Sequence, residues 1–240
     1  MSQAPLILRP AGVTGLTAPP ETPPETSPET SAASPRFEEP RTRRVAEVVA
    51  VLLSTPLWLP LLGLLMLTVR LDSPGPAVYR QRRYGKDGRV FTLLKLRSMR
   101  EGADAGLPDL LAACPAAAAE WGRHAKLRRD PRLTRLGWWL RRSSLDELPQ
   151  LLNVLRGEMS LVGPRPVPIE ERARYGDGFA HYRRVRPGLT GLWQVCGRNE
   201  LPYRRRISLD RRYVQRRGWG MDLWVLGRTL AAVCGGRGAY

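Results

Sequence analysis

Two neighbouring carboxylates, Asp146 and Glu147, are the residues of this chain best suited to chemistry. They follow two serines at an apparent helix start, and Ser144 with Glu147 has the spacing of a capping box. Capping is therefore one interpretation of the pair. Phosphate chemistry is the other, because an ionised aspartate can attack phosphorus while its neighbour holds Mg²⁺. Pro149 would cost a hydrogen bond inside a helix that began at Ser144, which favours a helix start nearer Pro149.

Arginines flank the acid pair in positions that suit a phosphate group. Arg141 lies about one turn upstream, and Arg165 stands between two prolines after Gly163. Proline on both sides limits backbone freedom, so the Arg165 guanidinium can be presented to a diphosphate at small entropic cost. Arg142 is interpreted as an ordinary surface arginine. Residues 186–191 (RPGLTG) are expected to form a loop whose glycines let the backbone approach a ligand closely.

The charge balance agrees with a phosphate-rich partner. The chain has 240 residues and a formal net charge of +17, and only Lys86, Lys95 and Lys126 are lysines, so nearly all the positive charge is arginine. Guanidinium groups pair bidentately with phosphate and keep their charge near lipid headgroups. Phosphate, a membrane surface and nucleic acid are all admissible partners. Three scattered cysteines and two isolated histidines argue against a disulfide framework and a zinc site and favour a reducing cytoplasm.

By composition the chain divides into three parts. Residues 1–40 repeat Pro, Thr, Glu and Ser with few large apolar residues, so they are predicted to be a disordered tail. This tail lacks the short apolar core and cleavage site of a secretory signal. Residues 41–70 hold a long apolar stretch, and residues 71–240 are predicted to form a cytosolic domain.

The apolar stretch from Val45 to Val69 is longer than the roughly 20 residues that a spanning helix needs, yet Pro56 and Pro60 lie in its middle. Because proline removes a helical hydrogen bond, the sequence predicts a break at Ser54, Thr55 and Pro56, where two hydroxyls can bond freed carbonyls. Arginines on both sides draw both ends towards the cytoplasm. A monotopic, re-entrant helix-break-helix would keep both arginine-flanked ends on the cytoplasmic side, and a kinked spanning helix is the alternative.

Beyond this stretch the pattern predicts a helix-rich α+β domain. Residues 72–88 are rich in turn formers, and residues 89–97 resemble a short strand. Weak patterning over residues 102–121 is typical of a variable helical excursion. Tryptophans interleaved with arginines favour amphipathic helices at a headgroup boundary. Short amphipathic helices are predicted over residues 133–140, 148–155, 207–214 and 223–233.

Several ordered motifs resemble those of one family. From Arg43 to Tyr240 the chain is similar to the bacterial sugar transferases, the small monotopic polyprenyl-phosphate phosphoglycosyl transferases of exopolysaccharide and glycoconjugate assembly. The similarity rests on the collinear blocks DSPGPAVYRQRRYGKDG, FTLLKLRSM, DPRLTRLG, RRSSLDELPQLLNVLRGEMSLVGPRP, RPGLTGLWQV with GRN, and LDRRYV. Thr55 departs from the serine usual before the membrane proline but keeps a hydroxyl. Cys196 departs from a small polar residue, which bears on sugar selectivity.

The resemblance implies a ping-pong transfer of sugar 1-phosphate from a UDP-sugar to undecaprenyl phosphate, the first membrane step of exopolysaccharide or glycoconjugate synthesis. Asp146 is then expected to be the nucleophile that displaces UMP and carries the phosphosugar, and Glu147 is expected to bind the Mg²⁺ cofactor. Such an enzyme is expected on the cytoplasmic face of the plasma membrane, in contact with membrane lipids. The family motifs assign substrate binding to five further residues: Arg141, Arg165, Lys95, Arg97 and Asp210.

Two other functions fit parts of the sequence. High charge with interleaved aromatic residues suits a nucleic-acid-binding protein. A non-catalytic basic membrane scaffold would need only the apolar stretch and the arginines. Neither function explains the acid pair together with the family motifs, so no nucleic acid is expected as a partner.

Overall fold

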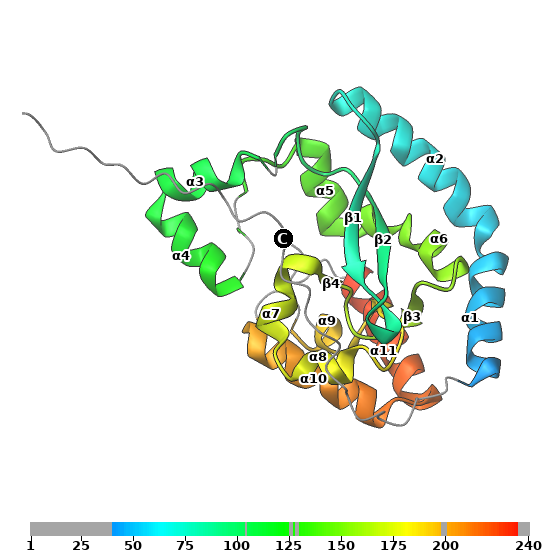
Figure 1. The fold of residues 1–240 in the computed structure, drawn as a ribbon. Helices are drawn as coiled ribbons and strands as arrows, with labels where there is room; N and C mark the ends of the chain where they lie inside the picture. Colours follow the sequence, from blue (N-terminus) through cyan, green and yellow to red (C-terminus); the bar gives the residue numbers. More distant parts are fainter. Residues whose placement is uncertain (1–39, 104, 125–126, 128–129, 198–200, 235–240) are drawn as a thin grey trace, which may run out of the picture. The chain divides into compact units, whose positions relative to one another are not determined.

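The computed structural model describes residues 40–103, 105–124, 127, 130–197 and 201–234 (Figure 1). The tail predicted for residues 1–40 lies outside this part of the chain, apart from Pro40. Described residues form many helices and a few short strands. The predicted helix-rich α+β class is therefore confirmed.

The apolar stretch forms two helices, α1 (Arg41–Leu53) and α2 (Thr55–Asp72), with Ser54 between them. Figure 1 shows a change of direction where they meet. Pro56 lies at the start of α2, where a missing N–H costs little. Pro60 lies inside α2 without ending it, so the stretch is interrupted once.

At this interruption one backbone carbonyl accepts hydrogen bonds from three side chains. Ser54 Oγ donates to the Val51 carbonyl at 2.9 Å, and Thr55 Oγ1 donates to the same oxygen at 3.1 Å. Trp58 Nε1 donates to it at 3.2 Å. The interruption falls where the sequence predicts a break, and the two hydroxyls bond a carbonyl as expected.

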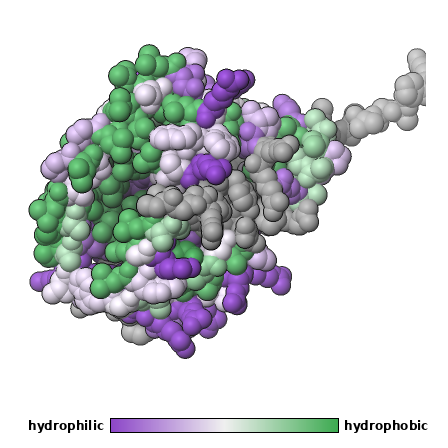
Figure 2. All heavy atoms as spheres, turned by 180° about the vertical axis from the view of Figure 1, so that it is seen from behind, coloured by the Kyte–Doolittle hydropathy of each residue, from purple (hydrophilic) through white to green (hydrophobic). Residues whose placement is uncertain are grey.

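These two helices bury one apolar face and expose the other. Their exposed side chains form a broad apolar band on the side of the molecule that carries α1 and α2 (Figure 2). An exposed apolar surface of this extent marks contact with lipid or another protein. Among the described residues, α2 is the one helix long and apolar enough to cross a membrane. The band consists of Val45, Val49, Leu52, Leu53, Leu57, Leu59, Leu61, Leu64, Leu67 and Leu71.

A small antiparallel sheet follows α2. β1 (Val78–Tyr84) pairs along its length with β2 (Val90–Leu96), and the turn between them contains η1 (Lys86–Gly88). β4 (Val167–Pro168) pairs with the other edge of β1. The strand predicted over residues 89–97 is confirmed as β2.

The turn-rich interpretation of residues 72–88 is wrong over β1. No residue of β1 is fully buried, so the strand has little of the apolar alternation that identifies strands in a sequence. Its backbone hydrogen bonds to β2 hold it instead. A pairing partner, rather than burial, makes this segment a strand.

Helices form most of the remaining chain, and β3 (Ser160–Val162) pairs in parallel with β5 (Gly188–Thr190). The helical excursion is confirmed as α3 and α4, and the four predicted amphipathic helices are confirmed as α5, α6, α10 and α11. The elements are α3 (Leu107–Ala113), α4 (Pro115–His124), α5 (Arg135–Ser143), η2 (Leu145–Glu147), α6 (Gln150–Leu155), η3 (Ile169–Glu171), α7 (Arg172–Tyr175), α8 (Gly178–Tyr182), α9 (Leu192–Cys196), α10 (Tyr203–Arg216) and α11 (Trp219–Cys234).

Three buried clusters hold these elements together. The first packs α1 and α2 against β2, α5 and α6. The second packs β3 and α9 against α10 and α11, and the third joins β4 to α7 and α8. The apolar helices thus share a core with the strand and helices that surround the acid pair.

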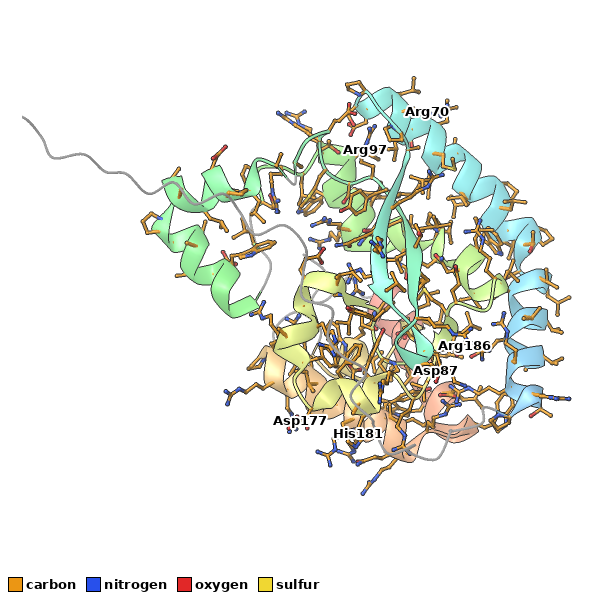
Figure 3. All side chains as sticks on the ribbon, viewed as in Figure 1. Arg70, Asp87, Arg97, Asp177, His181 and Arg186 are labelled. Atoms are coloured by element: carbon orange, nitrogen blue, oxygen red, sulfur yellow. The ribbon has the colours of Figure 1, made fainter. Side chains whose placement is uncertain are left out.

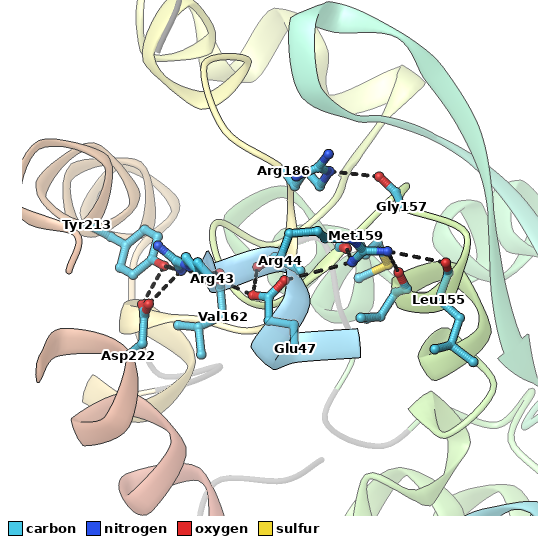
Figure 4. A network of polar contacts seen from close by, with 12 residues as sticks. Arg43, Arg44, Glu47, Leu155, Gly157, Met159, Val162, Arg186, Tyr213 and Asp222 are labelled. Atoms are coloured by element: carbon cyan, nitrogen blue, oxygen red, sulfur yellow. Dashed lines mark hydrogen bonds and ion pairs between the residues drawn. The ribbon is translucent and has the colours of Figure 1, made fainter. Parts of the chain in front are cut away.

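Two arginines at the start of α1 bind inside the protein (Figure 4). Arg43 Nη2 lies 2.7 Å from Asp222 Oδ2 on α11 and donates to Tyr213 Oη on α10 at 2.6 Å. Arg44 donates to a carbonyl at the end of α6 at 2.5 Å. Of Arg41, Arg43 and Arg44, the arginines before the apolar stretch that the structure describes, Arg41 alone is exposed. The guanidinium groups of Arg43 and Arg44 therefore fix the start of α1 to the domain.

Replacing Arg43 by methionine is expected to destabilise the protein strongly. The substitution leaves Asp222 buried without its cation, and losing one partner of a buried ion pair costs about 3–5 kcal/mol. Thermal unfolding of detergent-purified protein measures the effect. Arg41→Met, on the same helix but exposed, is the matched control and should change stability by less than about 0.5 kcal/mol. Equal melting temperatures for the two variants would contradict the anchoring role.

Candidate active site

The acid pair lies in a short turn between α5 and α6. Ser144 takes up a left-handed conformation (φ +59°) that leads the chain from α5 into η2. Its side chain makes no capping hydrogen bond, so the capping box does not form. α6 begins at Gln150, as the position of Pro149 suggested. Asp146 and Glu147 therefore have other partners.

Both carboxylates face cations from distant parts of the chain. Lys95 Nζ, on β2, lies 2.7 Å from Asp146 Oδ2 and 3.7 Å from Glu147 Oε1. Arg165 Nη2 lies 2.9 Å from Glu147 Oε1. Asp146 Oδ2 accepts no well-directed hydrogen bond, so its contact with Lys95 is an ion pair set by charge and distance. Asp146 is only 2% exposed, and a buried charge persists when it is paired in this way.

The acid pair borders a cavity of about 1180 Å³. Typical small-molecule sites enclose about 300–1,000 Å³, so this cavity has room for a nucleotide sugar and part of a second ligand. Asp210 is the one residue assigned from the sequence that does not line it. The other six do: Lys95, Arg97, Arg141, Asp146, Glu147 and Arg165.

Backbone contacts fix the loop that presents Arg165. Gly163 N donates to Thr190 O at 2.9 Å, and a Cβ on Gly163 would stand 2.7 Å from Gly188 N. The loop can therefore pack this closely only with glycine there. The glycines of residues 186–191 approach the backbone of the Arg165 loop and brace it, while Leu189 and Thr190 of the same segment line the cavity.

Arg141 and Arg97 line the cavity at different places. Arg141 Nε donates to Ser98 Oγ at 2.9 Å. Burial lowers the pKa of Arg141, while the negative charges of Asp146 and Asp130 act in the opposite direction. Arg97 donates to the carbonyls of Ser73 and Pro74 at 2.6 Å each, in the turn after α2. Arg141 thus belongs to the acid-pair region, while Arg97 lies at the end of α2.

Asp210 lies behind the cavity wall. It is 2% exposed, and Tyr175 Oη donates to Asp210 Oδ2 at 2.6 Å. Tyr175 lines the cavity, whereas Asp210 does not. Burial raises the pKa of Asp210 to about 8, and its other carboxyl oxygen has no hydrogen-bond partner. Asp210 is thus connected to the cavity by its hydrogen bond with Tyr175 and not as a lining residue.

Arg83 is a supporting residue that the sequence does not reveal. Its Nη1 donates to Pro166 O at 2.8 Å, immediately after Arg165. Burial lowers the pKa of Arg83 to about 10, with the like charge of Arg165 acting in the same direction. The contact crosses 83 residues of sequence and depends on the pairing of β1 with β4. No local signal could have found it.

Part of the cavity wall is aromatic. Arg132 lies over the ring of Trp121 with 5.7 Å to its centroid, and Arg206 lies over Trp193 at 4.9 Å. The alternation of tryptophan with arginine was interpreted as headgroup contact. Trp121 and Trp193 line the cavity, and each packs against an arginine. The aromatic lining residues are Tyr79, Trp121, Tyr175, Trp193 and Tyr203.

The donor set fits a magnesium ion shared with a phosphate ligand. Within the described part of the chain, no group of three or more His, Cys, Asp or Glu residues could hold a metal. Mg²⁺ commonly uses only one or two protein carboxylates, together with water and substrate phosphates. Asp146 and Glu147 supply that number of carboxylates at adjacent positions.

Comparison with known proteins gives consistent matches. Residues 39–236 match the profile of a family described as bacterial sugar transferase. The exopolysaccharide production protein ExoY of Sinorhizobium fredii is 45% identical over 193 residues, which cover 80% of this chain and 84% of ExoY.

Two further relatives carry reaction names. A UDP-glucose:undecaprenyl-phosphate glucose-1-phosphate transferase of Caulobacter vibrioides is 43% identical over 215 residues, covering 86% of this chain and 74% of the relative. An undecaprenyl-phosphate galactose phosphotransferase of Salmonella typhimurium is 42% identical over 198 residues. That match covers 82% of this chain but 41% of the Salmonella protein.

The raised pKa of Asp210 predicts a pH-dependent stability. Its folded pKa of about 8 lies above its ordinary value of 3.8, so between these values the folded protein keeps a proton that the unfolded chain releases. Stability should therefore fall as pH rises through this window. Asp210→Asn removes the titrating group, so the melting temperature of the wild type relative to this variant should decline from about pH 5 to about pH 8. Parallel melting curves against pH would contradict the assignment.

Proposed function

We propose that this chain, which belongs to the bacterial sugar transferase family, transfers a sugar 1-phosphate from a UDP-sugar to undecaprenyl phosphate. Family membership makes the chain a transferase. The Caulobacter and Salmonella relatives are named for reactions of this class, one with glucose and one with galactose. Because the two named sugars differ, we assign the reaction class and leave the sugar unassigned.

Asp146 is the observation that carries this function. It is an almost fully buried carboxylate on the wall of a large cavity rich in arginine. In the first step, an Asp146 oxygen attacks the phosphorus that bears the sugar, the bond from that phosphorus to the UMP oxygen breaks, and UMP leaves. In the second step, a phosphate oxygen of the lipid attacks the same phosphorus and the Asp146 carboxylate is released. Each step forms one P–O bond and breaks another.

The cations around Asp146 suit this chemistry. Lys95 lies 2.7 Å from the Asp146 carboxylate and holds it in place. As negative charge moves from the carboxylate to the phosphoryl oxygens, the same ammonium group is close enough to stabilise it there. Arg165 and Arg141 present guanidinium groups to the same cavity. Planar guanidinium groups bind phosphate oxygens bidentately, so these two arginines are assigned to the diphosphate of the donor.

Glu147 is assigned to the magnesium ion. Its carboxylate is oriented by Arg165 at 2.9 Å, beside the nucleophile. Bound Mg²⁺ would neutralise charge on the diphosphate and on the departing UMP. To bind the ion, Glu147 would have to give up part of its contact with Arg165. The phosphate oxygens of the donor would then bind the Arg165 guanidinium group in its place.

We also propose that α1 and α2 enter and leave the membrane by its cytoplasmic face. Both ends of the segment bind the same domain, through Arg43 and Arg44 at the start and Arg97 at the end. A spanning helix would separate its ends by about 30 Å of hydrocarbon. The exposed apolar band supports lipid contact, and the bonds at Ser54 and Thr55 supply hydrogen-bond partners where water is absent.

Asp146→Asn is expected to abolish UMP release. Detergent-purified protein is given Mg²⁺, undecaprenyl phosphate and a panel of UDP-sugars, and UMP is measured. Losing a nucleophile should lower turnover by about 10³-fold or more. Asp177→Asn, an exposed aspartate at the far edge of the domain (Figure 3), should keep wild-type turnover.

Two arms of this experiment identify which part of the proposal is at fault. Chelation of Mg²⁺ should stop turnover reversibly. Unchanged turnover would show that the reaction does not require the metal. Turnover by the Asp146→Asn variant at the wild-type rate would remove Asp146. Folded wild-type protein that releases no UMP with any donor would remove the reaction class.

Single cysteines at Pro40 and Asp72 test the membrane topology. Cys114, Cys196 and Cys234 are first replaced by serine, since Cys114 and Cys196 are exposed and would react. A membrane-impermeant maleimide should label both introduced positions only from the cytoplasmic side. Labelling of the two positions from opposite sides would establish a spanning helix instead.

A further inference from the structure

We propose that the lipid acceptor brings its phosphate into the cavity at the end of α2, where Arg97 is the residue that receives it. This inference rests on the proposed function and adds to it a route for the second substrate. We call this place the α2 mouth and define it by the turn at residues 73–76 with Tyr79 and Arg97.

Arg97 and the turn after α2 hold each other in place. The two Nη groups of Arg97 donate to the carbonyls of Ser73 and Pro74. Gly75 has a φ of +104°, and a Cβ there would stand 2.3 Å from Arg97 Nη1. Only glycine combines this backbone conformation with this contact. The end of α2 is thus fixed directly to the strand that carries Lys95.

The cavity connects this turn with the acid pair. Pro76 and Tyr79 line it at the α2 end, and Asp146 lines it in the region of η2. Lys95 lies in β2 and Arg97 directly follows the strand, where Arg97 N donates to Ala77 O at 2.9 Å and continues its pairing, so the two side chains are expected on the same side of the chain. A phosphate bound by Arg97 would therefore lie close to Lys95, which contacts Asp146.

In the described part of the chain, Arg97 has an acidic neighbour but no ion pair at contact distance: the Glu101 carboxylate, which also lines the cavity, lies on the same side of Gly75 as Arg97 Nη1. Lys95 and Arg165 are both paired with the acid pair. Arg97 makes no ion pair with any residue that the structure describes, and its Nε is buried without a hydrogen-bond partner. Both Nη groups are bonded to carbonyls, so a phosphate that reached this half-buried guanidinium group would add the charge-assisted contact that it does not have within the described residues.

The surroundings favour an anion with an apolar tail over a water-soluble nucleotide sugar. Arg70 and Arg97 lie at the same end of the molecule, where α2 stops (Figure 3). Leu64, Leu67 and Leu71 are 56–78% exposed on the last turns of α2. A prenyl chain can follow these leucines while its phosphate turns in at Arg97. The donor has no group that would use this apolar approach.

Arg97→Gln separates the two half-reactions. With Mg²⁺ and an accepted UDP-sugar but no lipid, the variant should release a first equivalent of UMP within about twofold of the wild-type amplitude. In nanodiscs containing undecaprenyl phosphate, its KM for the lipid should rise about tenfold or more, because a charge-assisted contact with phosphate is lost. Arg97→Lys, which keeps the charge, should recover part of this loss. Arg82→Gln, an exposed arginine on β1 outside the cavity lining, is the matched control.

A binding measurement decides the question independently of turnover. Undecaprenyl phosphate should raise the melting temperature of the wild type and the Arg82 variant but not of Arg97→Gln, whereas a UDP-sugar should stabilise all three. The proposal is overturned if the lipid still raises the melting temperature of Arg97→Gln. It is also overturned if the variant has a smaller UMP burst and a higher KM for the donor while its KM for the lipid is unchanged. A wild type without a burst would contradict the ping-pong function, and the lipid-induced shift would still test the α2 mouth. If Arg97→Gln does not fold, the same comparison is made with Arg97→Lys.

Discussion

The structure depends on keeping one buried carboxylate paired with a cation from another element. Asp146 is nearly inaccessible to solvent and has Lys95 at 2.7 Å. Burying an unpaired charge would cost several kcal/mol, so η2 and β2 must stay in register. Glu147 extends the arrangement to Arg165, whose loop is braced by glycine contacts with β5. Three segments that are far apart in the sequence are therefore held around one group of alternating charges.

The apolar helices form part of the same construction. Arg43 ties the start of α1 to α10 and α11, and Arg97 ties the end of α2 to the strand that carries Lys95. Side chains from α2, β2, α5 and α6 share one buried cluster. The proposed transfer from a water-soluble donor to a lipid would require Asp146 to be held at a fixed height relative to the bilayer. Direct attachment of both helix ends to the catalytic domain provides that fixed height.

Local signals predicted local structure well. The prolines and hydroxyls near Ser54 located the interruption between α1 and α2, and apolar spacing located β2 and four of the helices. β1 was not predicted as a strand, because none of its residues is fully buried and its sequence lacks the apolar alternation of a strand. The turn-forming residues around it were the stronger signal. The resemblance to a family brought Lys95, Asp146 and Arg165 to one site before their distances were known. The resemblance could not show that Asp210 is buried and bonded to Tyr175, because that contact joins α7 to α10 across 35 residues of sequence.

The central claim is that Asp146 becomes covalently bound to the phosphosugar. The most direct measurement is mass spectrometry of the purified protein after incubation with Mg²⁺ and an accepted UDP-sugar, without lipid. The account predicts an added mass of one sugar phosphate, located on the peptide that contains Asp146 and removed when undecaprenyl phosphate is supplied. An unmodified protein that releases UMP only when the lipid is present would contradict it, because the sugar phosphate would then pass directly from donor to acceptor.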